Sequence, residues 1–247
     1  MKKKNLGFTL AEVLIVIGII GVVAALTLPN LNHATGDKET VTRLQKAYSI
    51  LNEANDRAVA IYGPISTWHS NCNELFPNCW MKRIGEFLKV SKSCDETSGD
   101  EGSSGYSSCE YLVDNAGNGL VYQLPDGITL SADGSIPNCD DDSYTLYNNI
   151  PNDVCVDTVY LDINGPNKGK HKMGEDLFIL AVSNSLGIVA SGDGNFEDTL
   201  SSCLRNHWDC EFWVLEYGNL DYLKADTSGK CNDSNIILDG TTNTSCH

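Results

Sequence analysis

The sequence predicts an α+β protein in which one long N-terminal helix precedes an antiparallel sheet. Apolar residues fill positions 8–28, and apolar side chains then recur at helical spacing as far as Tyr62. After Gly119 the pattern changes to short runs of β-branched and aromatic residues separated by Gly, Asp and Pro. A helix followed by strands that form hairpins is the order expected of the α+β class.

The N-terminus combines a short basic segment, residues 1–7, with the apolar block. A helix over 8–29 would be about 33 Å long, enough to cross a bilayer core of about 30 Å. Three lysines before Gly7 would hold that end in the cytoplasm and deliver the remainder outside. Two alternatives are a secretory signal peptide cut near Ala24 or Ala25 and a plain membrane anchor.

An acidic residue within the apolar block argues against both alternatives. Both predict an uninterrupted apolar core, yet Glu12 lies within it. A carboxylate at the centre of a spanning helix costs about 2.5 to 3.5 kcal/mol, and less near an end. If the chain were cut between Gly7 and Phe8, the new amine would lie about one helical turn from Glu12. We therefore expect this carboxylate to pair with the amine of another subunit.

These residues resemble the type IV prepilin family, whose class III signal is a basic leader ending in Gly, then Phe-Thr-Leu-x-Glu and an apolar helix. Gly7, Phe8 and Glu12 match that signal in order, and Pro29 matches a proline that many pilins carry. The resemblance implies that a prepilin peptidase cuts after Gly7 and methylates the Phe8 amine. It also implies that Glu12 pairs with a neighbour's N-terminus, and that the fold is pilin-like with a disulfide-rich head.

The region after the apolar block divides into four parts. Residues 30–62 predict an amphipathic helix, which Gly63 and Pro64 would end. Residues 63–119 are rich in loop formers, with a helical candidate at 79–90. Residues 120–224 predict the antiparallel sheet, and 225–247 form a tail that contains cysteines. Strands are expected at 120–124, 128–131, 155–163, 177–182 and 188–190.

Two short strings in the sheet region also resemble prepilin-like proteins of the type II secretion kind. One combines residues 159–167 with 174–178, and the other covers 213–224. Both are short strings rather than complete motifs. They extend the resemblance beyond the N-terminus.

Ten cysteines, an even number, all follow the apolar block. Their spacing lacks the C-x-x-C pairs typical of zinc and redox sites, which favours disulfides formed in an oxidising compartment. Short local loops such as Cys72 with Cys79 and Cys231 with Cys246 are expected, although the sequence leaves the connectivity open. The candidates are Cys72, Cys79, Cys94, Cys109, Cys139, Cys155, Cys203, Cys210, Cys231 and Cys246.

The net charge of −16 disfavours nucleic acid as a partner, because phosphate binding depends on Lys and Arg. Asp162, Asn164 and Asp176 offer oxygen ligands of the kind Ca²⁺ prefers, and major pseudopilins resemble this in holding calcium. The alternative is a cluster that forms a turn. No cofactor is expected to be required, with Ca²⁺ the one candidate. None of the five histidines lies in a recognisable catalytic motif.

We therefore expect a structural subunit of a type II secretion pseudopilus or a type IV pilus, and not an enzyme. The expected location is the bacterial inner membrane, in a single pass with the head outside, and then a periplasmic or cell-surface fibre. The expected partners are other pilin or pseudopilin subunits, prepilin peptidase, the inner-membrane assembly platform and membrane lipid. A minor pilin or adhesin at the fibre tip is the alternative, and a membrane-anchored enzyme is the more remote one.

Overall fold

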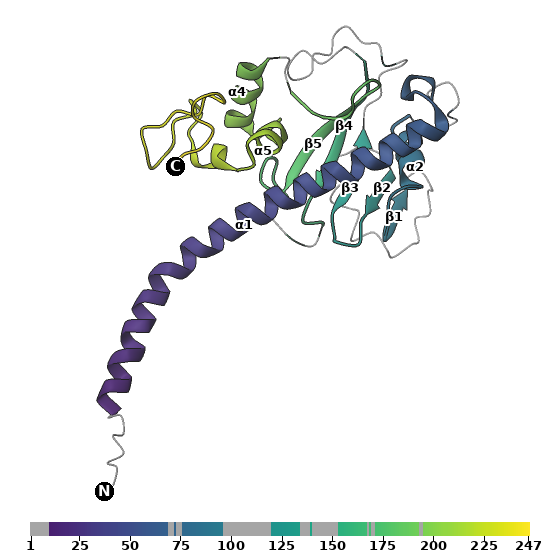
Figure 1. Ribbon diagram of the computed structural model, residues 1–247. Coiled ribbons are helices and arrows are strands. Elements are labelled where there is room, and N and C mark those ends of the chain that lie inside the picture. Colours follow the sequence, from purple (N-terminus) through teal and green to yellow (C-terminus); the bar gives the residue numbers. More distant parts are fainter. Residues whose placement is uncertain are drawn as a thin grey trace, which may run out of the picture. The chain divides into compact units, whose positions relative to one another are not determined.

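The computed structural model (Figure 1) contains two compact units, Met1–Glu39 and Thr40–His247. The first unit contains the beginning of helix α1 (Leu10–Tyr62), and the second unit, the head, contains its remainder. The structure describes residues 10–68, 72, 76–95, 120–133, 139, 153–166, 168, 171–192 and 195–247, without the side chains of 23–35, 76, 77 and 95.

Within the head, α1 presents a continuous apolar stripe. Leu44, Ala47, Leu51, Ala54 and Ala58 are all buried, at the three- and four-residue spacing that places side chains on one helix face. The helix ends at Tyr62, where Gly63 has a φ of +82° and its N–H donates to Val59 O. Glycine suits this left-handed position because it has no Cβ.

A six-stranded antiparallel meander follows, in the order β1-β2-β3-β4-β5-β6. It confirms the predicted α+β class. The central pairs are in register through Leu130 opposite Leu161 and Leu161 opposite Phe178. The strands are β1 (Lys92–Asp95), β2 (Leu120–Gln123), β3 (Thr129–Asp133), β4 (Val154–Asp162), β5 (Leu177–Ser183) and β6 (Gly187–Ala190).

Among the described elements of the head, the sequence pattern missed one strand and two α-helices. Strand β1 falls in the region expected to be loop, because its sequence Lys-Ser-Cys-Asp is short and polar and is ordered by pairing with β2. Helices α4 (Phe196–Asn206) and α5 (Glu211–Tyr217) lie where only sheet was expected. The side chain of Asn195 starts α4 by accepting a hydrogen bond from Asp198 N at 2.9 Å.

Helix α1 crosses the sheet in Figure 1, and its stripe shares one apolar core with the sheet and α2 (Phe76–Gly85). Helix α2 begins and ends earlier along the chain than the helix predicted at 79–90. Trp80 is fully buried in this core, and its Nε1 donates to Asn55 Oδ1 at 3.1 Å. All residues of β5 are buried, and α5 also packs against this strand.

Side chains of α1 also bind the edge of the sheet. Tyr48 Oη donates to the carbonyl of Ile188 at 3.1 Å, and the Ile188 N–H donates to Asn52 Oδ1 at 3.2 Å. Strand β6 is thereby capped on the side away from β5, where a free edge would invite pairing with another chain. Arg43 Nη1 donates to Ile163 O at 3.0 Å and so ties α1 to the end of β4.

Four disulfides join residues within the described ranges. They are Cys72–Cys79, Cys139–Cys155, Cys203–Cys210 and Cys231–Cys246. The first and last are the local pairs that the spacing predicted. Cys94 also takes part in a disulfide, and Cys109 lies outside the described residues.

Among the residues whose placement is described, no helix combines the length and the hydropathy needed to cross a membrane.

Leu51→Ala tests the contribution of the α1 stripe. Because Leu51 is fully buried, we expect a loss of about 2 to 5 kcal/mol in the free energy of unfolding, measured by urea titration of the detergent-solubilised chain. Ile61→Ala is the matched control, since Ile61 on the same helix is 64% exposed and should change stability by less than about 0.5 kcal/mol. Equal losses in the two variants would contradict the packing described.

Candidate functional site

The first part of α1 has an apolar surface on all sides. Large apolar side chains occupy five consecutive positions, 13–17, so no polar face interrupts them, and each is about half exposed or more. An exposed apolar surface of this extent marks a place for contact with lipid or protein. The residues are Leu10, Val13, Leu14, Ile15, Val16, Ile17, Ile19, Ile20 and Val22.

Glu12 lies in the first turn of α1 and is exposed there. It is the one charged residue between positions 10 and 22. A carboxylate near a helix N-terminus is favoured by the helix dipole. Gly7 and Phe8 lie outside the described residues, so cleavage between them stays a prediction.

The predicted oxygen cluster lies where β4 ends and β5 begins. Asp162 Oδ1 accepts hydrogen bonds from the N–H groups of Asn164 at 2.9 Å and Gly165 at 2.8 Å. Asp176 accepts from Lys172 N at 2.7 Å and His171 N at 3.1 Å. These contacts fix the two turns, which is the alternative interpretation of the cluster.

The second carboxylate oxygen of Asp162 lies 3.0 Å from His171 Nδ1. Burial raises the pKa of Asp162, and the N–H groups of Gly165 and Asn164 partly offset that effect. Both carboxylates are thus already engaged by donors of the chain, and the described residues contain no group of three or more His, Cys, Asp or Glu that could hold a metal. Calcium binding at Asp162, Asn164 and Asp176 stays a prediction that this donor arrangement does not favour.

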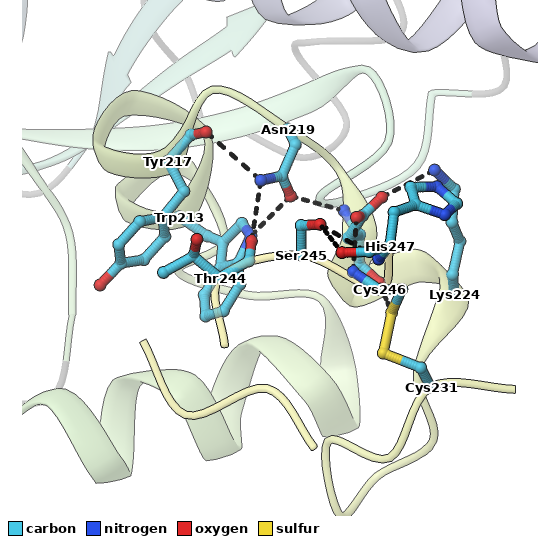
Figure 2. Close-up of polar contacts among 10 residues, drawn as sticks. Trp213, Tyr217, Asn219, Lys224, Cys231, Thr244, Ser245, Cys246 and His247 are labelled. Atoms are coloured by element: carbon cyan, nitrogen blue, oxygen red, sulfur yellow. Dashed lines mark hydrogen bonds and ion pairs between the residues drawn. A yellow bond between two sulfur atoms is a disulfide. The ribbon is translucent and has the colours of Figure 1, made fainter. Parts of the chain in front are cut away.

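A second polar cluster holds the C-terminal tail (Figure 2). The side-chain oxygen of Asn219 accepts from Trp213 Nε1 and from Asp221 N, both at 2.9 Å. Its amide nitrogen donates to Thr244 O at 2.9 Å and to Tyr217 O at 3.3 Å. One amide therefore uses both its oxygen and its nitrogen to join α5 to the last residues of the chain.

Asp221 completes this cluster from the short helix η7 (Asp221–Lys224). Its buried carboxylate accepts from Lys224 Nζ at 2.7 Å and from Cys246 N at 2.8 Å, next to the Cys231–Cys246 disulfide. Burial alone would raise the pKa of Asp221, but the Lys224 ammonium and the Cys246 N–H outweigh it and hold the pKa below its usual range. The carboxylate and the disulfide together fasten the tail.

Glu211, at the start of α5, is a buried carboxyl that no motif or spacing in the sequence identified. It is 1% exposed, and within the described part of the chain its Oε1 has no hydrogen-bond partner. Burial, together with the charge of Asp209, raises the pKa of Glu211 well above its ordinary value. A carboxyl in this environment favours the protonated form.

Comparison with known proteins assigns the N-terminal segment. Residues 2–28 match the prokaryotic N-terminal methylation motif. The chain has a prepilin-type N-terminus. This motif is consistent with the type IV pilin and pseudopilin families and supports a prepilin-like subunit in general. No curated protein and no solved structure matches the chain.

The prepilin-type motif carries general implications for processing and assembly. Proteins with such a motif are generally structural, are processed by prepilin peptidase and assemble with other pilins. They are membrane-anchored at first and then belong to an extracellular fibre. The motif thus accounts for the apolar residues between positions 10 and 22 and for Glu12, the one acidic residue among them.

The two short strings singled out in the sheet region, residues 159–167 with 174–178 and residues 213–224, have structural roles in the head. The first contains Asp162 and Asp176, whose carboxylates fix the turns between β4 and β5. The second contains Asn219 and Asp221, which fasten the tail. Sequence reasoning noted these strings without identifying the roles of Asn219 and Asp221, because their partners in the tail lie about 25 residues further along the chain. The one signal in the sequence that pointed to Asn219 and Asp221 was the resemblance of residues 213–224 to prepilin-like proteins.

Asp221→Asn should weaken the attachment of the tail. We expect a loss of about 1.5 to 3 kcal/mol in the free energy of unfolding at pH 7, because the charged hydrogen bonds are lost. Since the pKa of Asp221 is lowered on folding, its contribution is present above pH 4 and disappears as the pH falls through that lowered pKa. The difference between wild type and variant should therefore shrink below about pH 4.

The matched control for this variant is Asp233→Asn, which changes an exposed carboxylate of the tail. Unfolding of both variants is followed by tryptophan fluorescence in urea across the pH range. A loss that stays constant down to pH 2, or one that Asp233→Asn shares, would contradict the role assigned to Asp221.

Proposed function

We propose that this protein is a prepilin-like structural subunit of a type II secretion pseudopilus or a type IV pilus. In this proposal it is processed after Gly7 and assembled through its N-terminal helix. The observation that supports it most is the methylation motif at residues 2–28, which coincides with the apolar surface of α1.

Assembly follows from the chemistry of the helix. Before assembly, residues 8–29 would lie in the inner membrane, with the head outside, where disulfides are stable. Cleavage would create an amine at Phe8, about one helical turn from Glu12. In the fibre, Glu12 would pair with the amine of a neighbouring subunit while the apolar helices pack together. The inner-membrane assembly platform would act on this helix.

The head is built to move with α1 when the helix is pulled. Residues 40–62 of α1 are joined to the sheet by their buried apolar stripe. Hydrogen bonds add to this connection and join Tyr48 and Asn52 to β6 and Arg43 to the end of β4. Strain applied along the helix would be shared among these contacts. Such a connection suits a subunit that is lifted from the membrane into a fibre.

A minor pilin or adhesin at the fibre tip is the second candidate. The side chains of Leu186, Trp208 and Ile237 are each about half exposed on the head. Disulfides cross-link the head near its C-terminus. Exposed apolar and aromatic side chains are typical of binding surfaces. Immunogold labelling separates the two candidates, since a major subunit should be labelled along the whole fibre and a tip protein only at its end.

Intact-mass measurement of the membrane-extracted protein tests the processing step. We expect a chain that begins at Phe8 and carries one methyl group on its amine. Deletion of the peptidase should restore the unmethylated chain beginning at Met1. A mature chain that begins at Ala25 or Leu26 would instead show ordinary signal-peptide cleavage and would overturn the proposal.

Glu12→Ala tests the pairing step. Cleavage should remain normal, whereas incorporation into fibres should fall at least tenfold, because the neighbour's amine loses its partner in an apolar core. Glu39→Ala is the control, since it removes an exposed carboxylate from the same helix outside the motif. Sheared fibres and membranes are quantified by immunoblot, and normal incorporation of the Glu12 variant would remove the pairing argument.

A further inference from the structure

The head contains a groove between α1, the segment that follows α2 and the turn between β2 and β3. Its volume is about 470 Å³. Ile50, Phe87 and Leu124 supply apolar lining, and the cationic side chains of Lys46, Arg57 and Lys89 also line it. The groove can therefore accept an apolar side chain that has acidic neighbours.

The charge of the groove differs in sign from that of the whole chain. Its three cations face two carboxylates, of which Asp126 pairs with Lys46 at 2.6 Å and Glu53 pairs with Arg57. Lys89 is exposed and forms no ion pair within the described part of the head. On a chain with a net charge of −16, such a groove is complementary to acidic surfaces of the same protein.

One acidic surface of this kind lies on the tail, at residues 233–239, which we call the tail segment. Ile237 is 53% exposed there, while the next residue, Leu238, is buried. The segment is held in place because Cys231 N donates to Ile236 O at 2.9 Å and because Lys230 forms a β-bridge with Ile237. An apolar side chain is thus presented outward by an ordered backbone.

Acidic residues stand at both ends of the tail segment. Asp239 accepts hydrogen bonds from the N–H groups of Asn243 and Thr241, which lower its pKa to about 2 and keep it charged. Asp233 is exposed, so its carboxylate is available to a cation of another molecule. The segment therefore has the apolar centre and acidic ends that the groove can accommodate.

The groove and the tail segment lie on different parts of the head. The groove includes the turn between β2 and β3, whereas the tail lies beside α4 and α5, on the side of β5 away from β1 and β2 (Figure 1). A contact between two different surfaces of identical subunits is heterologous. When its rotation does not close into a ring, repetition of such a contact produces a helical filament.

We propose that the groove of one copy binds the tail segment of the next copy in the fibre. Ile237 enters the apolar part of the groove, and Asp233 faces Lys89. This contact rests on the proposed function, because it requires the fibre. It adds a contact between heads to the packing of the N-terminal helices, and it gives the fastened tail a role in assembly.

A charge exchange in the full-length chain tests the contact. Lys89→Glu and Asp233→Lys should each lower the yield of sheared fibres about fivefold, whereas the double variant should recover to within about twofold of wild type. Lys168→Glu, an exposed lysine outside the groove, is the matched control and should leave the yield unchanged. Processing and thermal midpoint are measured for every variant, so that misfolding is recognised.

A photo-crosslinker at Asn235 provides the second measurement. In fibres it should join two copies of the chain, and the attached peptides should contain residues 46–57 or 87–89. Wild-type fibres with crosslinks elsewhere, crosslinks to another protein, or a double variant no better than the single ones would overturn this contact alone. Absence of the wild-type chain from fibres would overturn the proposed function and the contact with it.

Discussion

The head depends on the burial of one stripe of α1 against the antiparallel sheet. Leu44, Leu51 and Ala58 are fully excluded from water, and burial of side chains of this size is the largest favourable contribution to folding. The stripe also brings Tyr48 and Asn52 to the edge of β6, where they satisfy backbone groups of the strand. The same packing therefore stabilises the sheet, protects its edge and connects it to the helix that carries the methylation motif.

Apolar side chains are buried in the head but exposed in the described part of the first unit. In the head, apolar side chains from α1, α2 and the strands share a large core, and polar residues fix the turns and the tail around it. In the first unit the apolar residues between Leu10 and Val22 are exposed, and Glu12 is the charged residue among them. A surface of this kind gains stability when lipid or neighbouring helices cover it. This difference is what the proposed passage from membrane to fibre requires.

Sequence reasoning predicted those features that follow from periodicity. The helix to Tyr62 and the strands β4 and β5 all follow from regular spacing of apolar residues. It missed α4 and α5, because Cys203 within α4 and Cys210 just before α5 were interpreted only as disulfide partners. It also missed the fastening of the tail, since a hydrogen bond from Asn219 to Thr244 leaves no periodic signal. Gly7 and Phe8 were predicted from the motif alone, and they lie outside the described residues.

Helical reconstruction of the fibres by electron cryomicroscopy tests the central claim most directly, because it shows the assembled subunits themselves. The account predicts a core of packed N-terminal helices that begin at Phe8, with the heads outside and Glu12 within hydrogen-bonding distance of a neighbour's N-terminal amine. Fibres in which these helices lie outside the core, or in which Glu12 faces solvent, would contradict it.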